Sequence, residues 1–142
     1  MNILTKPDRP TPGDIFSYPY LWHWQDQRGE TEGRKPRPSC LALAVQNSQG
    51  ETVLFIVPIT STEPDPQRAA ILVPVLEARR ANLDMDIPLW VIVDEVNTDI
   101  WERSYYLEDR TPQGRFSDQF TRQVLRRLRE ELARNRRLVS RI

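Results

Sequence analysis

The sequence predicts a mainly β domain of the α+β class: a small antiparallel β-barrel that ends in one C-terminal α-helix. Short apolar or alternating runs recur along most of the chain, turn residues separate them, and one helical apolar pattern follows them. A chain of 142 residues has the usual size of one domain, and no internal repeat interrupts it. We therefore expect a single domain over 12–142, preceded by a flexible, proline-rich leader over 1–11.

The strand predictions follow from apolar composition bounded by turn residues. A hairpin is expected over 40–57, because two apolar runs flank the polar turn 47–50. Pro74 cannot donate to a central ladder, so its run is expected at a sheet edge. Residues 76–83 fit a helical turn or a plain connection equally well, and the charged segment 25–36 is expected to be an exposed loop. The predicted strands are 13–18, 40–45, 52–57, 70–75, 89–93 and 101–106.

The C-terminal helix is predicted over about 117–135. Ser117 is a suitable N-cap, and Asp118 places an acidic side chain in the first turn. The apolar residues that follow share one helical face, and several arginines occupy another. The apolar face consists of Phe120, Val124, Leu125, Leu128 and Leu132.

Composition excludes several classes of site. The chain has one cysteine, Cys40, and one histidine, His23, so neither a disulfide framework nor a Cys- or His-based metal site is available. We expect no metal and no cofactor. No apolar run approaches the roughly 20 residues that span a bilayer. The N-terminus lacks a secretory apolar segment, so we expect a cytoplasmic protein without membrane contact.

The net charge of zero hides an asymmetry. Residues 1–102 hold 9 Lys or Arg against 15 Asp or Glu, whereas residues 103–142 hold 11 Arg against 5 Asp or Glu. A basic end of this kind can bind a polyanion. The favoured interpretation is simpler: the basic helix faces water or pairs with the acidic body of its own domain.

Four segments, in this order and spacing, carry a resemblance to a known family. They are PGDI at 12–15, EGRKPRPSC at 32–40, FIVPITS at 55–61, and NLD at 82–84 followed by LWVIVDEVN at 89–97. Together they resemble the MazF/PemK family, the toxins of type II toxin–antitoxin systems.

The resemblance covers roughly residues 12–135 and implies a specific fold and chemistry. The family has an SH3-like barrel with a C-terminal helix, and its members are usually homodimers. Active members are metal-independent endoribonucleases that cut single-stranded RNA and inhibit growth. The 2′-hydroxyl attacks the adjacent phosphate and leaves a cyclic phosphate, and a cognate antitoxin protein covers the same groove.

Arg37 and Thr60 match the arginine of the family's Arg-Pro motif and the threonine of its Pro-x-Thr motif. The resemblance implies that the Arg37 guanidinium stabilises the charge that builds on the phosphate, for which its paired donors are suited. The Thr60 hydroxyl, assisted by Ser61, would bind a phosphate oxygen or orient the 2′-hydroxyl. The alternatives are a solvated Arg37 at a strand entry, and hydroxyls that merely end a strand with local backbone hydrogen bonds.

His23 is a third catalytic candidate, because imidazole exchanges protons near neutral pH; a structural role is the alternative. Lys35 and Arg34 are candidates for RNA phosphate contacts. Trp22 and Trp24 are candidates for stacking on bases, with the core or a dimer contact as the alternative.

Two other hypotheses remain open at this point. The domain could be a non-catalytic module of the same fold that binds RNA or a protein partner, or a purely structural dimeric scaffold. Convergence of Arg37 and Thr60 on one open groove would favour the enzyme. Asp94 and Glu95 are adjacent, so on a strand they should point to opposite faces and form no carboxylate pair.

Overall fold

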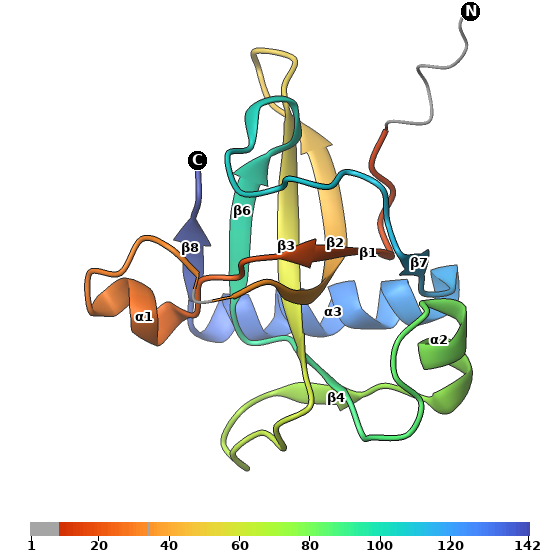
Figure 1. Ribbon diagram of the computed structural model, residues 1–142. Helices are drawn as coiled ribbons and strands as arrows, with labels where there is room; N and C mark the ends of the chain where they lie inside the picture. The colour runs from red at the N-terminus through yellow and green to blue at the C-terminus, as the bar shows by residue number, and fades with distance from the viewer. Residues whose placement is uncertain (1–8, 34) are drawn as a thin grey trace, which may run out of the picture.

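The computed structural model describes residues 9–33 and 35–142. In these residues the chain forms one mainly antiparallel sheet of eight strands, three α-helices and one 3₁₀ turn (Figure 1). None of the described helices is both long and apolar enough to cross a membrane. The elements are β1 (Asp14–Tyr18), α1 (His23–Gln27), β2 (Arg37–Gln46), β3 (Thr52–Thr60), β4 (Ala70–Leu72), α2 (Val75–Arg80), β5 (Trp90–Ile92), β6 (Val96–Ile100), η2 (Trp101–Arg103), β7 (Gly114–Arg115), α3 (Asp118–Arg134) and β8 (Leu138–Ser140).

The long strand β3 organises the sheet. The strand order is β4-β5-β3-β2-β1-β7, while β6 pairs with β3 and the C-terminal β8 runs parallel to β6. The prediction of a mainly β domain with a C-terminal helix is therefore confirmed. The described pairings leave β4, β7 and β8 at ends of the sheet, and no pairing closes it into a barrel.

The hairpin predicted over 40–57 is the largest unit of the sheet. Strands β2 and β3 pair from Ser39↔Pro58 to Gln46↔Thr52, with a bulge between Leu41 and Leu43. In the turn between these strands, Asn47 Oδ1 accepts hydrogen bonds from the backbone N–H groups of Gln49 and Glu51, which stabilises the turn.

Apolar side chains form two clusters. The larger cluster fills the space between the sheet and the helices α2 and α3, while the smaller one covers β1, β2 and β3 together with η2. Phe120, Val124 and Leu128 of the predicted apolar helix face are buried in the larger cluster. The helix begins as expected, because the Ser117 hydroxyl accepts a hydrogen bond from the Phe120 N–H at 3.1 Å.

Several local predictions change in the structure. Residues 101–106 are not a strand: Trp101 packs against Phe16 with ring centroids 6.0 Å apart, and the chain turns there as η2. The predicted loop 25–36 begins inside helix α1, and α2 shows that the ambiguous segment 76–83 starts as a helix. Of the predicted edge strand 70–75, only residues 70–72 form a strand, β4, and it does lie at an edge of the sheet; Pro74 instead precedes the first residue of α2. Of the expected leader, residues 1–8 lie outside the described part of the chain.

Candidate functional site

An open groove of about 460 Å³ lies where β2 and β3 meet α1 and the loop after β3. Four of the predicted site residues line it: two from the proposed catalytic set and two tryptophans. The remaining lining comes from the loop after β3 and from β5. The lining residues are Trp22, Trp24, Arg37, Thr60, Thr62, Glu63, Pro64, Asp65, Arg68 and Ile92.

The hairpin register explains why Arg37 and Thr60 meet. Ser39 of β2 pairs with Pro58 of β3. Arg37 lies two residues before Ser39, at the start of β2, and Thr60 lies two residues after Pro58, at the end of β3. A two-residue step along an antiparallel pair keeps both side chains on the same face. The motifs that suggested these residues are thus brought to one wall of the groove by ordinary strand pairing.

Arg37 presents a cation that is not neutralised within the described residues. Its guanidinium lies 5.2 Å from the centroid of the Trp22 ring, and it forms no ion pair with any described carboxylate. Partial burial lowers the pKa of Arg37, but a guanidinium stays charged at neutral pH. The side chain is therefore positioned and available to an anion in the groove.

Thr60 is buried at the end of β3, with 8% of its surface exposed. Its hydroxyl oxygen accepts a hydrogen bond from the Thr62 N–H at 3.1 Å, so the local, strand-ending role is present. The hydroxyl hydrogen has no acceptor within the described part of the chain. Thr60 can therefore still donate one hydrogen bond into the groove.

Trp22 and Trp24 line one side of the groove, which we call the aromatic wall, and they differ in how deeply they are buried. Trp22 packs edge-on against Tyr20, with ring centroids 5.2 Å apart, whereas Trp24 is 43% exposed. The Arg28 guanidinium lies 5.3 Å from the Trp24 centroid. The wall thus combines one fixed ring beside Arg37 with one ring open to solvent.

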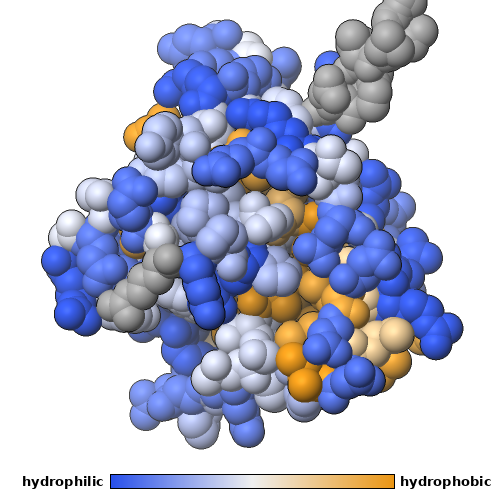
Figure 2. Space-filling model, viewed as in Figure 1, coloured by the Kyte–Doolittle hydropathy of each residue, from blue (hydrophilic) through white to orange (hydrophobic). Residues whose placement is uncertain are grey.

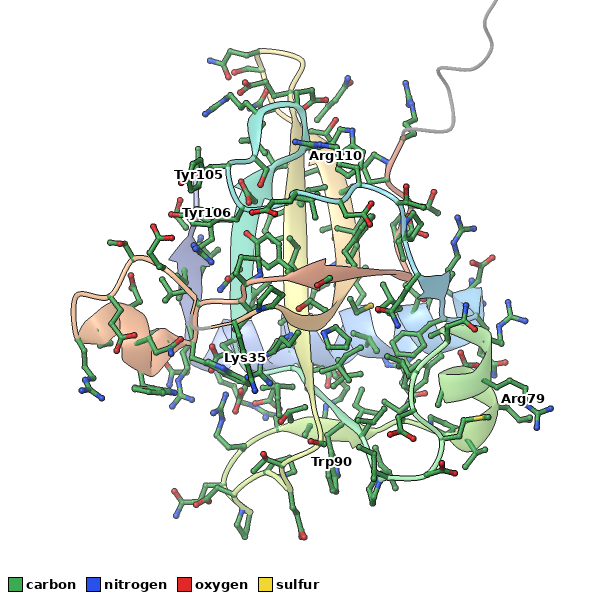
Figure 3. The ribbon with its side chains drawn as sticks, viewed as in Figure 1. Lys35, Arg79, Trp90, Tyr105, Tyr106 and Arg110 are labelled. Atoms are coloured by element: carbon green, nitrogen blue, oxygen red, sulfur yellow. The ribbon has the colours of Figure 1, made fainter. Side chains whose placement is uncertain are left out.

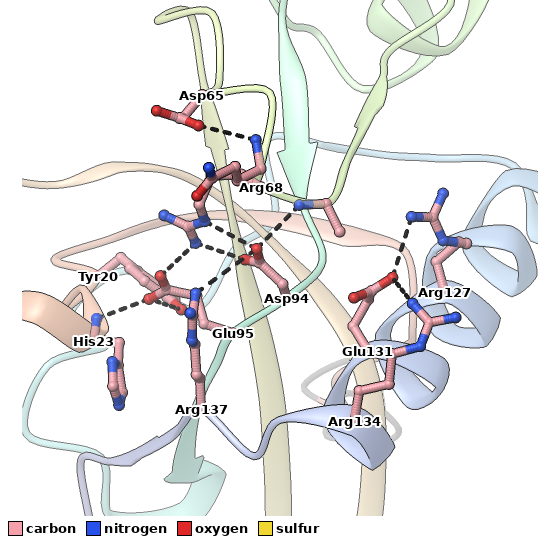
Figure 4. A network of polar contacts seen from close by, with 12 residues as sticks. Tyr20, His23, Asp65, Arg68, Asp94, Glu95, Arg127, Glu131, Arg134 and Arg137 are labelled. Carbon is pink, nitrogen blue, oxygen red and sulfur yellow. Dashed lines mark hydrogen bonds and ion pairs between the residues drawn. The ribbon is translucent and has the colours of Figure 1, made fainter.

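The other predicted residues do not reach this groove. His23 contributes only its backbone N–H, which donates to Glu95 Oε1 at 2.8 Å, and its ring lies away from the carboxylates (Figure 4). Ser61 is exposed and does not line the groove. Lys35 lines a separate cavity that also contacts Tyr106. Arg34 lies outside the described residues.

The expectation that Asp94 and Glu95 diverge is wrong. They fall in the bend between β5 and β6, so strand alternation does not apply, and both bind one Arg68 guanidinium, with Nη2 2.6 Å from Asp94 Oδ1 and 2.7 Å from Glu95 Oε2 (Figure 4). Burial alone would raise the pKa of Asp94, but hydrogen bonds from Arg68 and the Ala69 N–H outweigh it and lower that pKa. The same pairing raises the pKa of Arg68.

A buried polar row along β6 fixes the segment that carries the tryptophans. Glu95 accepts from the Tyr20 hydroxyl, Asn97 binds the backbone of Leu21, and Asp99 accepts from another tyrosine hydroxyl, that of Tyr18. The acceptors alternate in the sequence: Asn97 and Asp99 share one face of β6, and Glu95 lies in the bend directly before the strand. This alternation is visible in the sequence and is the signal that could have identified the row.

The charge of the groove is mixed. The carboxylates of Glu63 and Asp65 line it, and Arg68 is already paired with two buried carboxylates. The basic C-terminal region pairs in part with the acidic body, as the simpler interpretation expects, since Arg103 pairs with Glu51 and Arg115 with Asp14. Within α3, Arg127 and Arg134 pair with Glu131 of the same helix (Figure 4). Among the described residues, no three His, Cys, Asp or Glu side chains lie together as a metal site would require.

Comparison with known proteins identified no family model that matches the chain and no match among curated proteins.

Proposed function

We propose that this chain is the toxin component of a type II toxin–antitoxin system, an endoribonuclease that cleaves single-stranded RNA without a metal ion and inhibits growth. The observation that carries the proposal is the shared groove of Arg37 and Thr60, flanked by Trp22 and Trp24. A positioned cation, a hydroxyl donor and aromatic rings are the groups that RNA phosphates and unstacked bases require.

In the proposed reaction, a backbone phosphate binds at the Arg37 guanidinium while the Thr60 hydroxyl donates to one of its oxygens. The 2′-hydroxyl attacks the phosphorus and loses its proton to a base, and the bond to the 5′-oxygen breaks to give a 2′,3′-cyclic phosphate. The departing 5′-oxygen takes a proton from water and leaves as a hydroxyl. Arg37 stabilises the charge that builds on the phosphate oxygens. Glu63, an exposed carboxylate of the groove lining, is the candidate to accept the proton.

The proposal extends to fold and partners. We assign the sheet and its C-terminal helix to an SH3-like barrel, and we expect a cytoplasmic homodimer whose groove is blocked by a cognate antitoxin protein. The mixed charge of the groove suits such a partner, because Glu63 and Asp65 can bind its cations while Arg37 binds its carboxylates.

The test is cleavage of a long single-stranded RNA by the purified protein in excess EDTA. Discrete cuts are expected from the wild-type protein, and Arg37→Ala should lower the cleavage rate by about 10²-fold or more. Arg122→Ala is the matched control, since Arg122 is an exposed arginine on α3 and should leave the rate unchanged. Loss of activity in both variants, or cleavage unaffected by Arg37→Ala, would remove Arg37 from the mechanism.

A non-catalytic binding module is the second candidate. Two observations favour it: the Thr60 hydroxyl oxygen is used by Thr62, and no histidine ring reaches the groove. A folded wild-type protein that binds RNA or a protein partner but cuts no RNA under these conditions would support the module and exclude the nuclease.

A further inference from the structure

A second surface, which shares no lining residue with the groove, exposes a group of large apolar side chains. It comprises α2, the end of β4 and the loop before β5, and Figure 2 shows it as the apolar area at the lower right, where Figure 1 places α2. No residue of this surface lines the groove described above. We call it the α2 patch; its exposed apolar residues are Leu72, Val75, Leu76, Met85 and Ile87, between 45% and 69% exposed.

The α2 patch contains both a projection and a hollow. Leu76 stands 69% exposed on α2 and does not line the adjacent cavity. That cavity, of about 300 Å³, is lined by apolar side chains that include Leu72, Met85 and Ile87. A side chain the size of leucine fits a hollow of this volume. The α2 patch therefore carries a projecting leucine, Leu76, next to a cavity that can hold a leucine side chain.

Side chains of both charges lie beside the α2 patch. Arg79 and Arg80 at the end of α2 are exposed, and so are Asp84 and Asp86 in the following loop. None of the four forms an ion pair within the described part of the chain, although Asp84 Oδ1 accepts the Asp86 N–H. Two cations and two anions that form no ion pair with any described residue therefore border one apolar surface.

We propose that the α2 patch is the surface through which two copies of this chain associate about a two-fold axis. An interface of this kind must be complementary to itself, because the same residues face each other from both sides. Leu76 of each copy enters the hollow of the other, and the arginines of each copy face the aspartates of the other. In a two-fold dimer the leucine contact and the arginine–aspartate contact each occur twice. The dimer also covers an apolar area that is costly to leave in water.

The proposal deepens the expected homodimer, but it is argued from the α2 patch alone and its test is independent of RNA cleavage. A different protein partner would need its own apolar knob and charges of both signs in the inverse arrangement. The free edge of β4 borders the patch as well, since β4 pairs only with β5 in the described residues. Unpaired edges are sites where a second chain is commonly bound.

Sedimentation velocity over a wide concentration range tests the association. We expect a wild-type dimer, and Leu76→Glu should raise its dissociation constant by about tenfold or more, because it places a carboxylate in an apolar contact. Tyr105→Glu is the control: Tyr105 is 79% exposed at the opposite end of the molecule from Arg79 (Figure 3) and should leave the dimer unchanged. Circular dichroism establishes that each variant is folded.

A charge exchange tests the two-fold arrangement itself. Arg79→Glu with Arg80→Glu should give a monomer, and so should Asp84→Lys with Asp86→Lys. An equimolar mixture of the two double variants should recover a dimer, because each interface then joins opposite charges. A monomeric wild-type protein would overturn the homodimer, whereas a dimer insensitive to Leu76→Glu and to the charge exchange would overturn this surface.

Discussion

Asn97 satisfies both backbone polar groups of Leu21: its Oδ1 accepts the Leu21 N–H at 2.9 Å, and its Nδ2 donates to the Leu21 oxygen at 2.8 Å. Both residues are fully buried, so water cannot replace these hydrogen bonds. This contact joins β6 to the residue that directly precedes Trp22. One side chain thus fixes the aromatic wall of the groove to the sheet.

Asn97→Leu should lower the free energy of unfolding by about 2–4 kcal/mol, because it leaves a buried N–H and a buried carbonyl without partners. Urea denaturation at neutral pH measures the change. Asn47→Leu is the matched control, since Asn47 also accepts two backbone N–H groups but lies in a surface turn that water reaches, and it should cost about 1 kcal/mol or less. Equal losses would contradict the assigned role of Asn97.

Arg37 should account for one phosphate contact in RNA binding. The observable is the dependence of the binding constant on salt, measured with a 2′-deoxy analogue that cannot be cleaved. Arg37→Ala should reduce the slope of log K against log salt by about 0.7, the value for one phosphate of a single strand. Arg126→Ala on the exposed face of α3 should leave the slope unchanged. A slope that Arg37→Ala does not alter would show that the guanidinium binds no phosphate.

The stability of the protein should fall in acid partly through Asp94. Its pKa is lowered in the folded state, so the carboxylate contributes stability above its unfolded pKa of about 3.9, and the contribution is lost as the pH falls through the folded value. Asp94→Asn should flatten this acid limb and lower stability at neutral pH. Unfolding free energies between about pH 2 and pH 7 measure both effects. Asp26→Asn, at an exposed carboxylate outside both the groove and the α2 patch, should keep the wild-type profile.

Thr121 is buried on α3, and its hydroxyl has no hydrogen-bond partner among the described residues. Thr121→Val keeps the shape and removes the unsatisfied group, so it should raise the free energy of unfolding by about 1 kcal/mol. Thr121→Ser keeps the hydroxyl and removes a methyl group, and it should destabilise. Urea denaturation of both variants provides the measurement, and destabilisation by Thr121→Val would indicate a partner for the hydroxyl.

Local sequence patterns predicted the elements whose formation depends on residues close together in the sequence. The hairpin of β2 and β3 needed only two apolar runs around a turn, and α3 needed only its N-cap Ser117 and its apolar face. The short strands β7 and β8 were not predicted, because two or three residues carry no periodicity. Residues 101–106 were predicted as a strand, but the chain turns there as η2, where Trp101 packs against Phe16.

The groove, too, was predicted only in part from the sequence. The motifs around Arg37 and Thr60 indicated residues that do line one cavity, whereas His23, Ser61 and Lys35 were expected there and lie elsewhere. Neighbours in sequence do not share a site unless the backbone directs them to the same side.

The sequence by itself determined the mainly β character and the C-terminal helix, because composition and periodicity act over a few residues at a time. Only the tertiary structure decided that Arg68 joins Asp94 to Glu95, and that Arg37 remains without an ion pair among the described residues. Such pairings depend on chain segments far apart in sequence. Their free energies come from burial and charge at the point where the segments meet, which no local pattern records.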